Sequence, residues 1–256
     1  MRALVLAAGW ATRLGALAAD RPKHLLPVGG TTPLDVVVDR LDAVATVEAI
    51  DVVTHDAFLP AFQRWAAARD TRARLEIWSN GTARPEERRG AVGDLQYHLE
   101  RTGVSTDLLV LGGDQIFDDS LETLAKTSAR EIALAVHDVG TLARVSQAAS
   151  VELDAEGYVR RLVEKDPNPS TTLAVPAIYG IPARLLGEIG RYLEAEDRPD
   201  NLGYLAEWLV EHHPVRAVPL GGRWIDVGSP DDYDRARREF GGEEPKTMTR
   251  GGTRVP

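Results

Sequence analysis

The chain has 256 residues, no cysteine, 43% hydrophobic and 27% charged residues, and a net charge of −9. These values fit a globular chain with a sizeable core, and the missing cysteines exclude disulfides, thiolate nucleophiles and cysteine-ligated metals. The acidic balance argues against general nucleic-acid binding, so any phosphate chemistry must be local. No apolar run is long enough for a signal peptide or a membrane span, and we expect a cytoplasmic protein.

The hydrophobic pattern predicts strands alternating with helices over the first half of the chain. Residues 2–7 form a short apolar run typical of a buried parallel strand, and a polar loop over 12–24 follows it. A helix is expected from Pro33, with Thr32 as its cap. The alternation continues with strands at 49–54, 75–79, 107–111 and 131–137 and helices at 57–69, 90–101 and 120–129. Such alternation indicates an α/β fold with a mainly parallel sheet.

After residue 145 the pattern changes, although no composition shift divides the chain. A hairpin (150–154 and 158–163), a strand (172–181), two helices (183–196 and 200–212), two strands (215–219 and 223–227) and a helix (230–240) are expected in that order. The segment 241–256 is rich in glycine, proline and charge, which predicts a flexible tail. We therefore expect one domain over residues 1–240, with an acceptor-binding region near 140–220.

The loop after the first strand is the first place to look for a ligand in an open α/β sheet. Ala7, Ala8 and Gly9 are small enough for their backbone amides to approach an anion. Arg13 and Lys23 are the nearest cations, and a guanidinium and an ammonium would suit a triphosphate. Both could equally be surface charges, because neither a P-loop nor a dinucleotide fingerprint is present.

Two aspartates stand beside glycines at predicted strand ends. Asp114 follows the strand 107–111, and Asp226 ends the strand 223–227. Mg²⁺ prefers carboxylates together with phosphate oxygens, but turns and helix caps are the commoner roles of aspartate beside glycine. Asp118 and Asp119 look like caps for the helix at 120.

Residues 6–14 (LAAGWATRL) and 21–30 (RPKHLLPVGG) resemble the signature of the sugar-phosphate nucleotidylyltransferases. The resemblance implies a Rossmann-like nucleotidyltransferase fold of the GT-A type, a three-layer sandwich with a mostly parallel mixed sheet. It also implies an enzyme that joins a nucleoside triphosphate and a sugar 1-phosphate into a nucleotide sugar and pyrophosphate. Ala11 stands where many members have glycine, which we expect to change the shape of the loop more than the activity.

The resemblance assigns each matching residue a role. Arg13 would contact the leaving pyrophosphate, Lys23 the phosphates, and Asp114 and Asp226 the catalytic Mg²⁺. The nucleotide would be held by Leu6, Ala7, Ala8, Gly9, Asn80, Gly81 and Gly113. Asn80 and Gly81, with the helix start at residues 90–93, resemble the strip that reads the nucleobase, although a simple turn and cap would look the same.

The acceptor side resembles the family less closely. Glu164 and Lys165 match the E-K-P motif, in which the glutamate binds sugar hydroxyls and the lysine binds the sugar phosphate and aids catalysis, but Asp166 intervenes before the proline. Ala149 and Ala177 stand where relatives commonly have glycine against the sugar. We therefore expect an active enzyme whose acceptor is not plain glucose or mannose 1-phosphate but, for example, a modified hexose, heptose or cyclitol phosphate. Sequence drift with an unchanged acceptor would look the same.

Two other functions compete with this interpretation. A phosphocholine-type cytidylyltransferase of the same fold would need a cage for a quaternary amine, for which Trp10 and Trp224 are available. A non-catalytic regulatory paralogue that binds a nucleotide sugar would be expected to lose at least one of the four residues assigned to phosphate and metal binding. All four are present: Arg13, Lys23, Asp114 and Asp226. We expect a short form without the C-terminal β-helix of larger relatives, acting as a monomer or homodimer.

Overall fold

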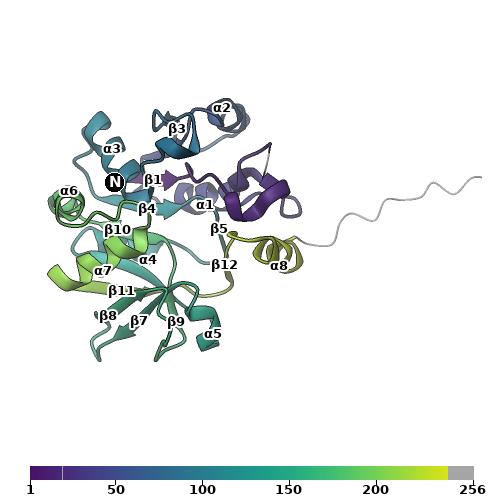
Figure 1. Cartoon of the computed structure of the whole chain (residues 1–256). Helices are drawn as coiled ribbons and strands as arrows, with labels where there is room; N and C mark the ends of the chain where they lie inside the picture. Colours follow the sequence, from purple (N-terminus) through teal and green to yellow (C-terminus); the bar gives the residue numbers. More distant parts are fainter. Residues whose placement is uncertain (19, 242–256) are drawn as a thin grey trace, which may run out of the picture.

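The structure is a computed structural model that describes residues 1–18 and 20–241 (Figure 1). The strands are β1 (Arg2–Leu6), β2 (Ala49–Thr54), β3 (Arg74–Ser79), β4 (Leu108–Gly112), β5 (Gln115–Phe117), β6 (Ile132–Asp138), β7 (Ala149–Leu153), β8 (Val159–Glu164), β9 (Leu173–Val175), β10 (Ile178–Ile181), β11 (Val215–Pro219) and β12 (Trp224–Asp226). The α-helices are α1 (Pro33–Asp42), α2 (Leu59–Ala67), α3 (Ala91–Thr102), α4 (Glu122–Ser128), α5 (Leu142–Val145), α6 (Gly187–Ala195), α7 (Leu202–His212) and α8 (Pro230–Phe240). The predicted tail, apart from residue 241, lies outside the described residues.

Ten strands form one mixed sheet in the order β3-β2-β1-β4-β10-β6-β9-β7-β8, with β11 beside β6. The half that carries the N-terminal strand is parallel, because β1 pairs in parallel with both β2 and β4. From β10 onward most pairs are antiparallel. The carboxyl ends of β1, β2 and β4 therefore lie at one edge of the sheet, where ligands bind in folds of this kind.

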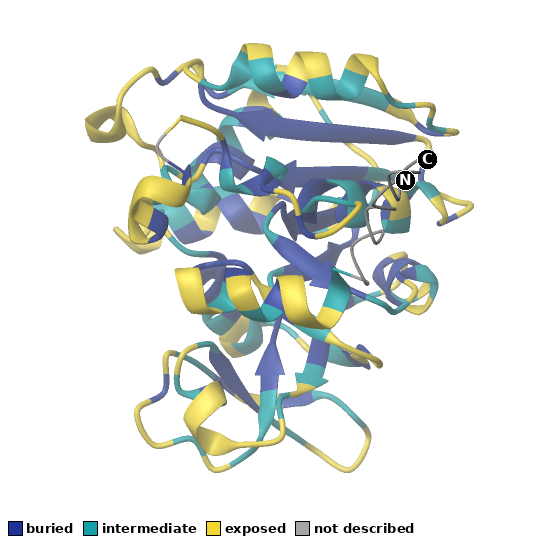
Figure 2. Ribbon diagram, turned by 90° about the vertical axis from the view of Figure 1, so that its right-hand side faces the viewer, coloured by how far each residue is buried: buried dark blue, intermediate teal, exposed yellow. Residues whose placement is uncertain are grey.

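The central strands β1, β2 and β4 are buried on both faces, as the continuous apolar run of β1 predicts, and Figure 2 shows buried strands in the middle of the molecule. Leu4 and Leu6 pack on the side of α3, α6 and α7, whereas Ala3 and Val5 pack on the side of α1, α2 and α4. This two-residue period places alternate side chains of one strand in two separate cores. The predicted sandwich of a mixed sheet between two helical layers is confirmed.

A third core joins the two ends of the described chain. The N-terminal loop contributes Leu14 and Leu26, β12 contributes Ile225, and α8 contributes Tyr233. In addition, the Tyr233 hydroxyl donates a hydrogen bond to the carbonyl of Pro27 at 2.7 Å. Figure 1 shows α8 and β12 beside the N-terminal loop. This packing brings the loop residues and the Asp226 region, far apart in sequence, to one place.

Three local predictions are wrong. The strand expected over 172–181 is split into β9 and β10, because Pro176 has no amide to donate to a sheet ladder. Asp118 and Asp119 do not cap a helix: Asp118 pairs with Arg223 at 2.8 Å, and Asp119 accepts a hydrogen bond from the amide of Gly221. The helix begins at Glu122 instead, so these two carboxylates hold the segment before β12.

Other boundaries agree with the sequence signals. Thr32 caps α1 with a full capping box, in which its hydroxyl accepts from the amide of Asp35 at 3.1 Å. No helix among residues 1–18 and 20–241 is both long enough and apolar enough to cross a membrane.

Candidate active site

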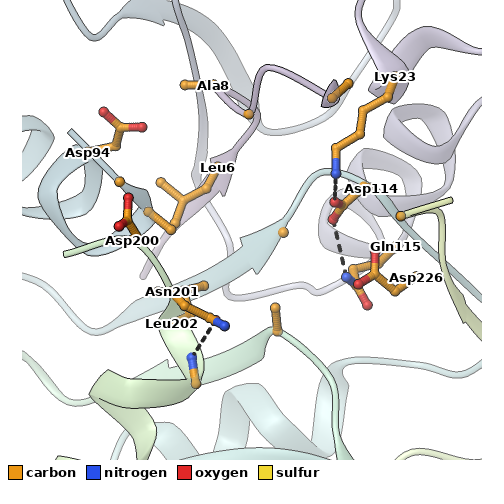
Figure 3. A pocket seen from close by; sticks show the side chains of 18 of the residues that line it. Leu6, Ala8, Lys23, Asp94, Asp114, Gln115, Asp200, Asn201, Leu202 and Asp226 are labelled. Carbon is orange, nitrogen blue, oxygen red and sulfur yellow. Dashed lines mark hydrogen bonds and ion pairs between the residues drawn. The ribbon is translucent and has the colours of Figure 1, made fainter. Parts of the chain in front are cut away.

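A cleft of about 660 Å³ opens at the carboxyl ends of β1 and β4 (Figure 3). It brings together residues from separated parts of the sequence: the N-terminal loop, the start of α3, the ends of β4, β8 and β12, and the start of α7. Of the predicted site residues it is lined by Leu6, Ala8, Gly9, Arg13, Lys23, Asn80, Asp114, Ala149, Glu164, Lys165, Ala177 and Asp226.

Three predicted site residues, Ala7, Gly81 and Gly113, are not among the residues that line the cleft. Ala7 is buried and donates its amide to the carbonyl of Val53. Gly113 donates its amide to the carbonyl of Leu6, and a Cβ there would lie 3.1 Å from side-chain atoms of both His24 and Val5. Gly81 has a φ of +74° and turns the chain after β3. These residues shape the backbone that presents the neighbouring cleft residues.

The amides of Ala8 and Gly9 have no protein hydrogen-bond partner within the described ranges, and both residues line the cleft. The loop is fixed at Trp10, whose ring stacks on His55 with centroids 3.8 Å apart and planes 4° apart. His55 is fully buried, and this burial lowers the pKa of its imidazole. A neutral ring at this place gives the loop an apolar anchor. The two amides without a protein partner belong to residues that line the cleft, where amides of this kind can bind an anion.

Ala11, the departure from glycine noted above, has a φ of +53°, in the left-handed region that costs an L-residue about 1–2 kcal/mol. We expect Ala11→Gly to raise the free energy of unfolding by roughly 0.5–1 kcal/mol, because removing this strain outweighs the greater unfolded-state freedom of glycine. Denaturant unfolding would measure the change. Ala67→Gly in the last turn of α2 is the matched control and is expected to lower stability, so a less stable Ala11→Gly protein would contradict the strain.

The floor of the cleft is a group of opposite charges. Lys23 donates to Oδ2 of Asp114, and the side chains are only 12% and 18% exposed. Burial alone would lower the pKa of Lys23, but the carboxylates of Asp114 and Asp226 outweigh it and raise that pKa. Burial likewise opposes ionisation of Asp114, yet Lys23 holds its pKa below the usual range. Both groups are therefore charged at neutral pH.

Asp226 reaches the same floor from β12. Its strand pairs with β5 so that Asp226 lies opposite Gln115, and the amide of Val227 donates to the carbonyl of Asp114 at 3.0 Å. Asp226 is open to the cleft, but the surrounding protein and then the Asp114 carboxylate raise its pKa to about 7. Burial and the neighbouring carboxylate both disfavour the ionised form of Asp226, and a bound cation would favour that form.

This pair of carboxylates fits a hard divalent cation that also takes substrate oxygens. Across the described residues, no group of three or more His, Cys, Asp or Glu side chains is placed to hold a metal by itself. Two carboxylates with open positions match the usual protein contribution to a Mg²⁺ that phosphates complete. Arg13 stands beside them, with its guanidinium packed on Gly228 just after β12.

The wall on the α3 side carries polar groups that Asn80 organises. The Asn80 side chain donates to Oδ1 of Asp94 at 2.8 Å and accepts from both the amide and the hydroxyl of Thr82. Gly90, expected to open α3 toward a ligand, instead lets Pro199 and Asp200 approach: the amides of Ala91 and Val92 donate to their carbonyls. These two amides at the start of α3 are therefore occupied by protein carbonyls. A ligand at this wall would have to be recognised by side chains instead.

The opposite wall is built around Glu164 and the start of α7. Asn201 caps α7 through the amide of Gly203, and its side-chain nitrogen donates to Oε1 of Glu164. Burial raises the pKa of the Glu164 carboxyl. A Cβ on Gly203 would lie 2.0 Å from Oε2 of Glu164, so only glycine leaves room for the carboxylate at the helix start.

Lys165, next to Glu164, has a φ of +53°, and its backbone amide donates to the carbonyl of Ala148. The inserted Asp166 does not enter the cleft: it is buried and accepts from the hydroxyl of Ser150 at 3.0 Å. The inserted Asp166 is thus held against β7 by its hydrogen bond to Ser150. Lys165 lines the cleft in a strained backbone conformation.

Among the cleft residues that the sequence interpretation missed are Asp94, Asn201 and Gly203. Asn201 before a predicted helix is an N-cap signal, and glycine in a first helical turn signals a close approach. Asp94 in the first turns of α3 carried no such signal.

The family model for nucleotidyl transferases matches residues 2–241. The chain belongs to this family. It is 27% identical over 242 residues to a glucose-1-phosphate thymidylyltransferase of Mycolicibacterium smegmatis, covering 90% of this chain and 79% of that protein. It is 28% identical to a Sulfolobus acidocaldarius protein assigned as a mannose-1-phosphate guanyltransferase, covering 93% and 62%. The resemblance seen in the two N-terminal motifs is thus confirmed.

A bifunctional protein GlmU from Methanocaldococcus jannaschii is 26% identical over 239 residues, which cover 93% of this chain but 54% of that protein. The chain spans about half the length of the GlmU proteins that it matches. Among solved structures, one from Bacillus anthracis, assigned as a glucose-1-phosphate thymidylyltransferase and bound to a sucrose, superimposes with a TM-score of 0.75 at 19% identity and covers 93% of this chain and 94% of that one. That likeness confirms the fold.

Proposed function

We propose that the protein condenses a nucleoside triphosphate with a sugar 1-phosphate to give a nucleotide sugar and pyrophosphate. One observation carries the proposal: free loop amides, Lys23 and Arg13 on one side and Lys165 and Glu164 on the other face a single cleft whose floor holds two carboxylates. The names of the family relatives describe reactions of this type.

In the proposed reaction, an oxygen of the sugar phosphate attacks the α-phosphorus while the bond to the β-phosphate breaks and pyrophosphate leaves. Both reactants are anions, so the protein mainly holds them together and offsets their charge. Lys23 and Arg13 would bind the triphosphate, and Lys165 would bind the acceptor phosphate. The acceptor is already ionised at pH 7, so no side-chain nucleophile is needed. Mg²⁺ held by Asp114 and Asp226 would supply further charge neutralisation when bound.

The two cleft tryptophans are committed to protein contacts, which weakens the case for a choline-type acceptor. Trp10 stacks on His55, and the Trp224 indole donates to Gln115 while its ring meets the edge of His137. An aromatic cage for a quaternary amine needs open ring faces. The cation Lys165 on the same cleft would also repel such a group.

The proposed choice of acceptor depends on Ala149 and Ala177, which line the cleft where the resemblance predicts glycine. Extra methyl groups remove space beside the sugar, and such changes discriminate between related substrates. We expect glucose 1-phosphate to be turned over more slowly than at least one modified hexose, heptose or cyclitol phosphate. Glucose 1-phosphate outperforming every other acceptor would contradict the expected selectivity.

A matrix of five nucleoside triphosphates against these acceptor phosphates, with Mg²⁺ present, tests the proposal through pyrophosphate release. We expect release only where triphosphate and acceptor are both present. A protein that releases no pyrophosphate from any pair, or releases it at the same rate without acceptor, would not be the proposed enzyme.

A further inference from the structure

The names of the relatives mention both thymidylyl and guanyl groups, so the nucleobase has to be argued from the cleft itself. The α3 wall of the cleft contains one charged side chain in its interior, Asp94, which is 6% exposed and lines the cavity. In Figure 3 it lies on the side of the cavity where Leu6 and Ala8 are drawn. A buried carboxyl is costly unless its oxygens are bonded, so its partners decide what it can do.

Asn80 bonds to only one of the two carboxyl oxygens of Asp94. Its side-chain nitrogen donates to Oδ1 of Asp94, while Oδ2 has no hydrogen-bond partner in the part of the chain that the structure describes. The orientation of the Asn80 amide is fixed, because its oxygen accepts from both the amide and the hydroxyl of Thr82. Asn80 therefore cannot turn its oxygen to the cleft. Its second side-chain N–H has no acceptor among residues 1–18 and 20–241.

The nearest cation does not neutralise Asp94 by direct contact. Arg89 donates its Nε to the carbonyl of Asn80 at 2.9 Å, and its guanidinium lies 4.1 Å from the centre of the Tyr97 ring. Burial raises the pKa of Asp94 to about 6, so the group is mostly ionised above that pH. The wall consequently offers a carboxylate that accepts hydrogen bonds, beside a single amide donor.

We infer that Asp94 selects guanine, with its carboxylate accepting from the neighbouring N–H groups of that base; this inference rests on the proposed function. Guanine presents two adjacent donors, N1–H and N2–H, next to the acceptor O6, which complements a carboxylate beside an amide N–H. Thymine and uracil present one N–H between two carbonyls, and these carbonyls would face the carboxylate. Adenine and cytosine present one amino group beside an unprotonated ring nitrogen. Only guanine offers two adjacent N–H groups to the carboxylate, whose Oδ2 is free and whose Oδ1 can accept a second hydrogen bond beside that from Asn80. Charge-assisted pairs of this kind discriminate strongly.

Kinetics with GTP and ITP test the assignment, because ITP differs from GTP only in lacking the 2-amino group. At a pH well above 6, we expect kcat/KM to be about 10-fold or more lower for ITP and about 100-fold lower for dTTP or UTP. Asp94→Asn should lower kcat/KM for GTP by about 10- to 100-fold, mainly through KM, and bring GTP and ITP close together. Glu100→Gln, an exposed carboxylate on the same helix, should leave the ratio unchanged.

Asp94→Asn is expected to fold, because it removes a buried charge and keeps a side chain of the same shape, and thermal unfolding would verify this. The wild-type comparison of GTP with ITP needs no variant, so the inference stays testable even if Asp94→Asn does not fold. Faster turnover with dTTP or UTP, or equal use of GTP and ITP, would overturn the guanine assignment while leaving the nucleotidyl transfer intact. If no acceptor is turned over, calorimetric binding of GTP, ITP and dTTP still decides the base.

Discussion

Asp114→Asn is expected to lower turnover by about 10³-fold or more at ordinary Mg²⁺ concentrations while leaving the fold intact. The amide keeps the shape of the side chain and can still accept a hydrogen bond from Lys23, but it removes the charge that, with Asp226, would bind the metal. Lys23 retains Asp226 as a neighbouring anion, so its buried ammonium is not left uncompensated. Pyrophosphate release measures the loss, and thermal unfolding checks the fold.

Asp118→Asn is the matched control for this change. Asp118 follows β5 four residues after Asp114, but it pairs with Arg223 at a partly exposed position outside the cleft. Loss of an exposed ion pair costs about 0–1 kcal/mol of stability, and we expect activity close to that of the wild type. If Asp114→Asn turned over at the wild-type rate, the assignment of Asp114 as a metal ligand would be wrong.

The fold could be predicted as far as local signals extend. The apolar run of β1 and the capped helix after Thr32 were both readable, because their patterns reflect burial on two faces and a satisfied helix start. The ribbon of β5 and β12 was not predicted in full, since β5 has three residues and no periodicity. Yet this ribbon places Asp226 opposite Gln115 and hence beside Asp114. Its pairing depends on contacts between segments about a hundred residues apart.

The residues of the candidate site likewise divide into those that local sequence signals could predict and those that they could not. Residues within the N-terminal motifs could be named because their spacing follows a recognisable signature, and Lys23 and Arg13 do line the cleft. Asp94 could not, since a lone aspartate in a helix has many ordinary roles, and its importance arises only when Asn80 occupies one of its oxygens. Sequence could therefore predict the phosphate chemistry of the site better than its selectivity for a base.

Gly203→Ala is expected to raise KM for the sugar phosphate by about 10- to 100-fold while KM for the nucleotide stays unchanged. The new Cβ would lie 2.0 Å from Oε2 of Glu164, so the carboxylate must leave the position set by Asn201. Hydrogen bonds that a carboxylate accepts are worth about 1.5–3 kcal/mol each, which sets the size of the effect. Because the clashing atom ends a flexible side chain and alanine favours a helix, the protein should remain as stable as the wild type.

Two further variants separate this positioning effect from general damage. Gly187→Ala places the same methyl group at the start of α6, where nothing lies within 4 Å, and should leave both KM values unchanged. In a Glu164→Ala background, Gly203→Ala should add little to the loss, because the group that it displaces is already gone. If the two changes were instead additive, or if Gly203→Ala left the acceptor KM unchanged, the start of α7 would not position Glu164 for the acceptor.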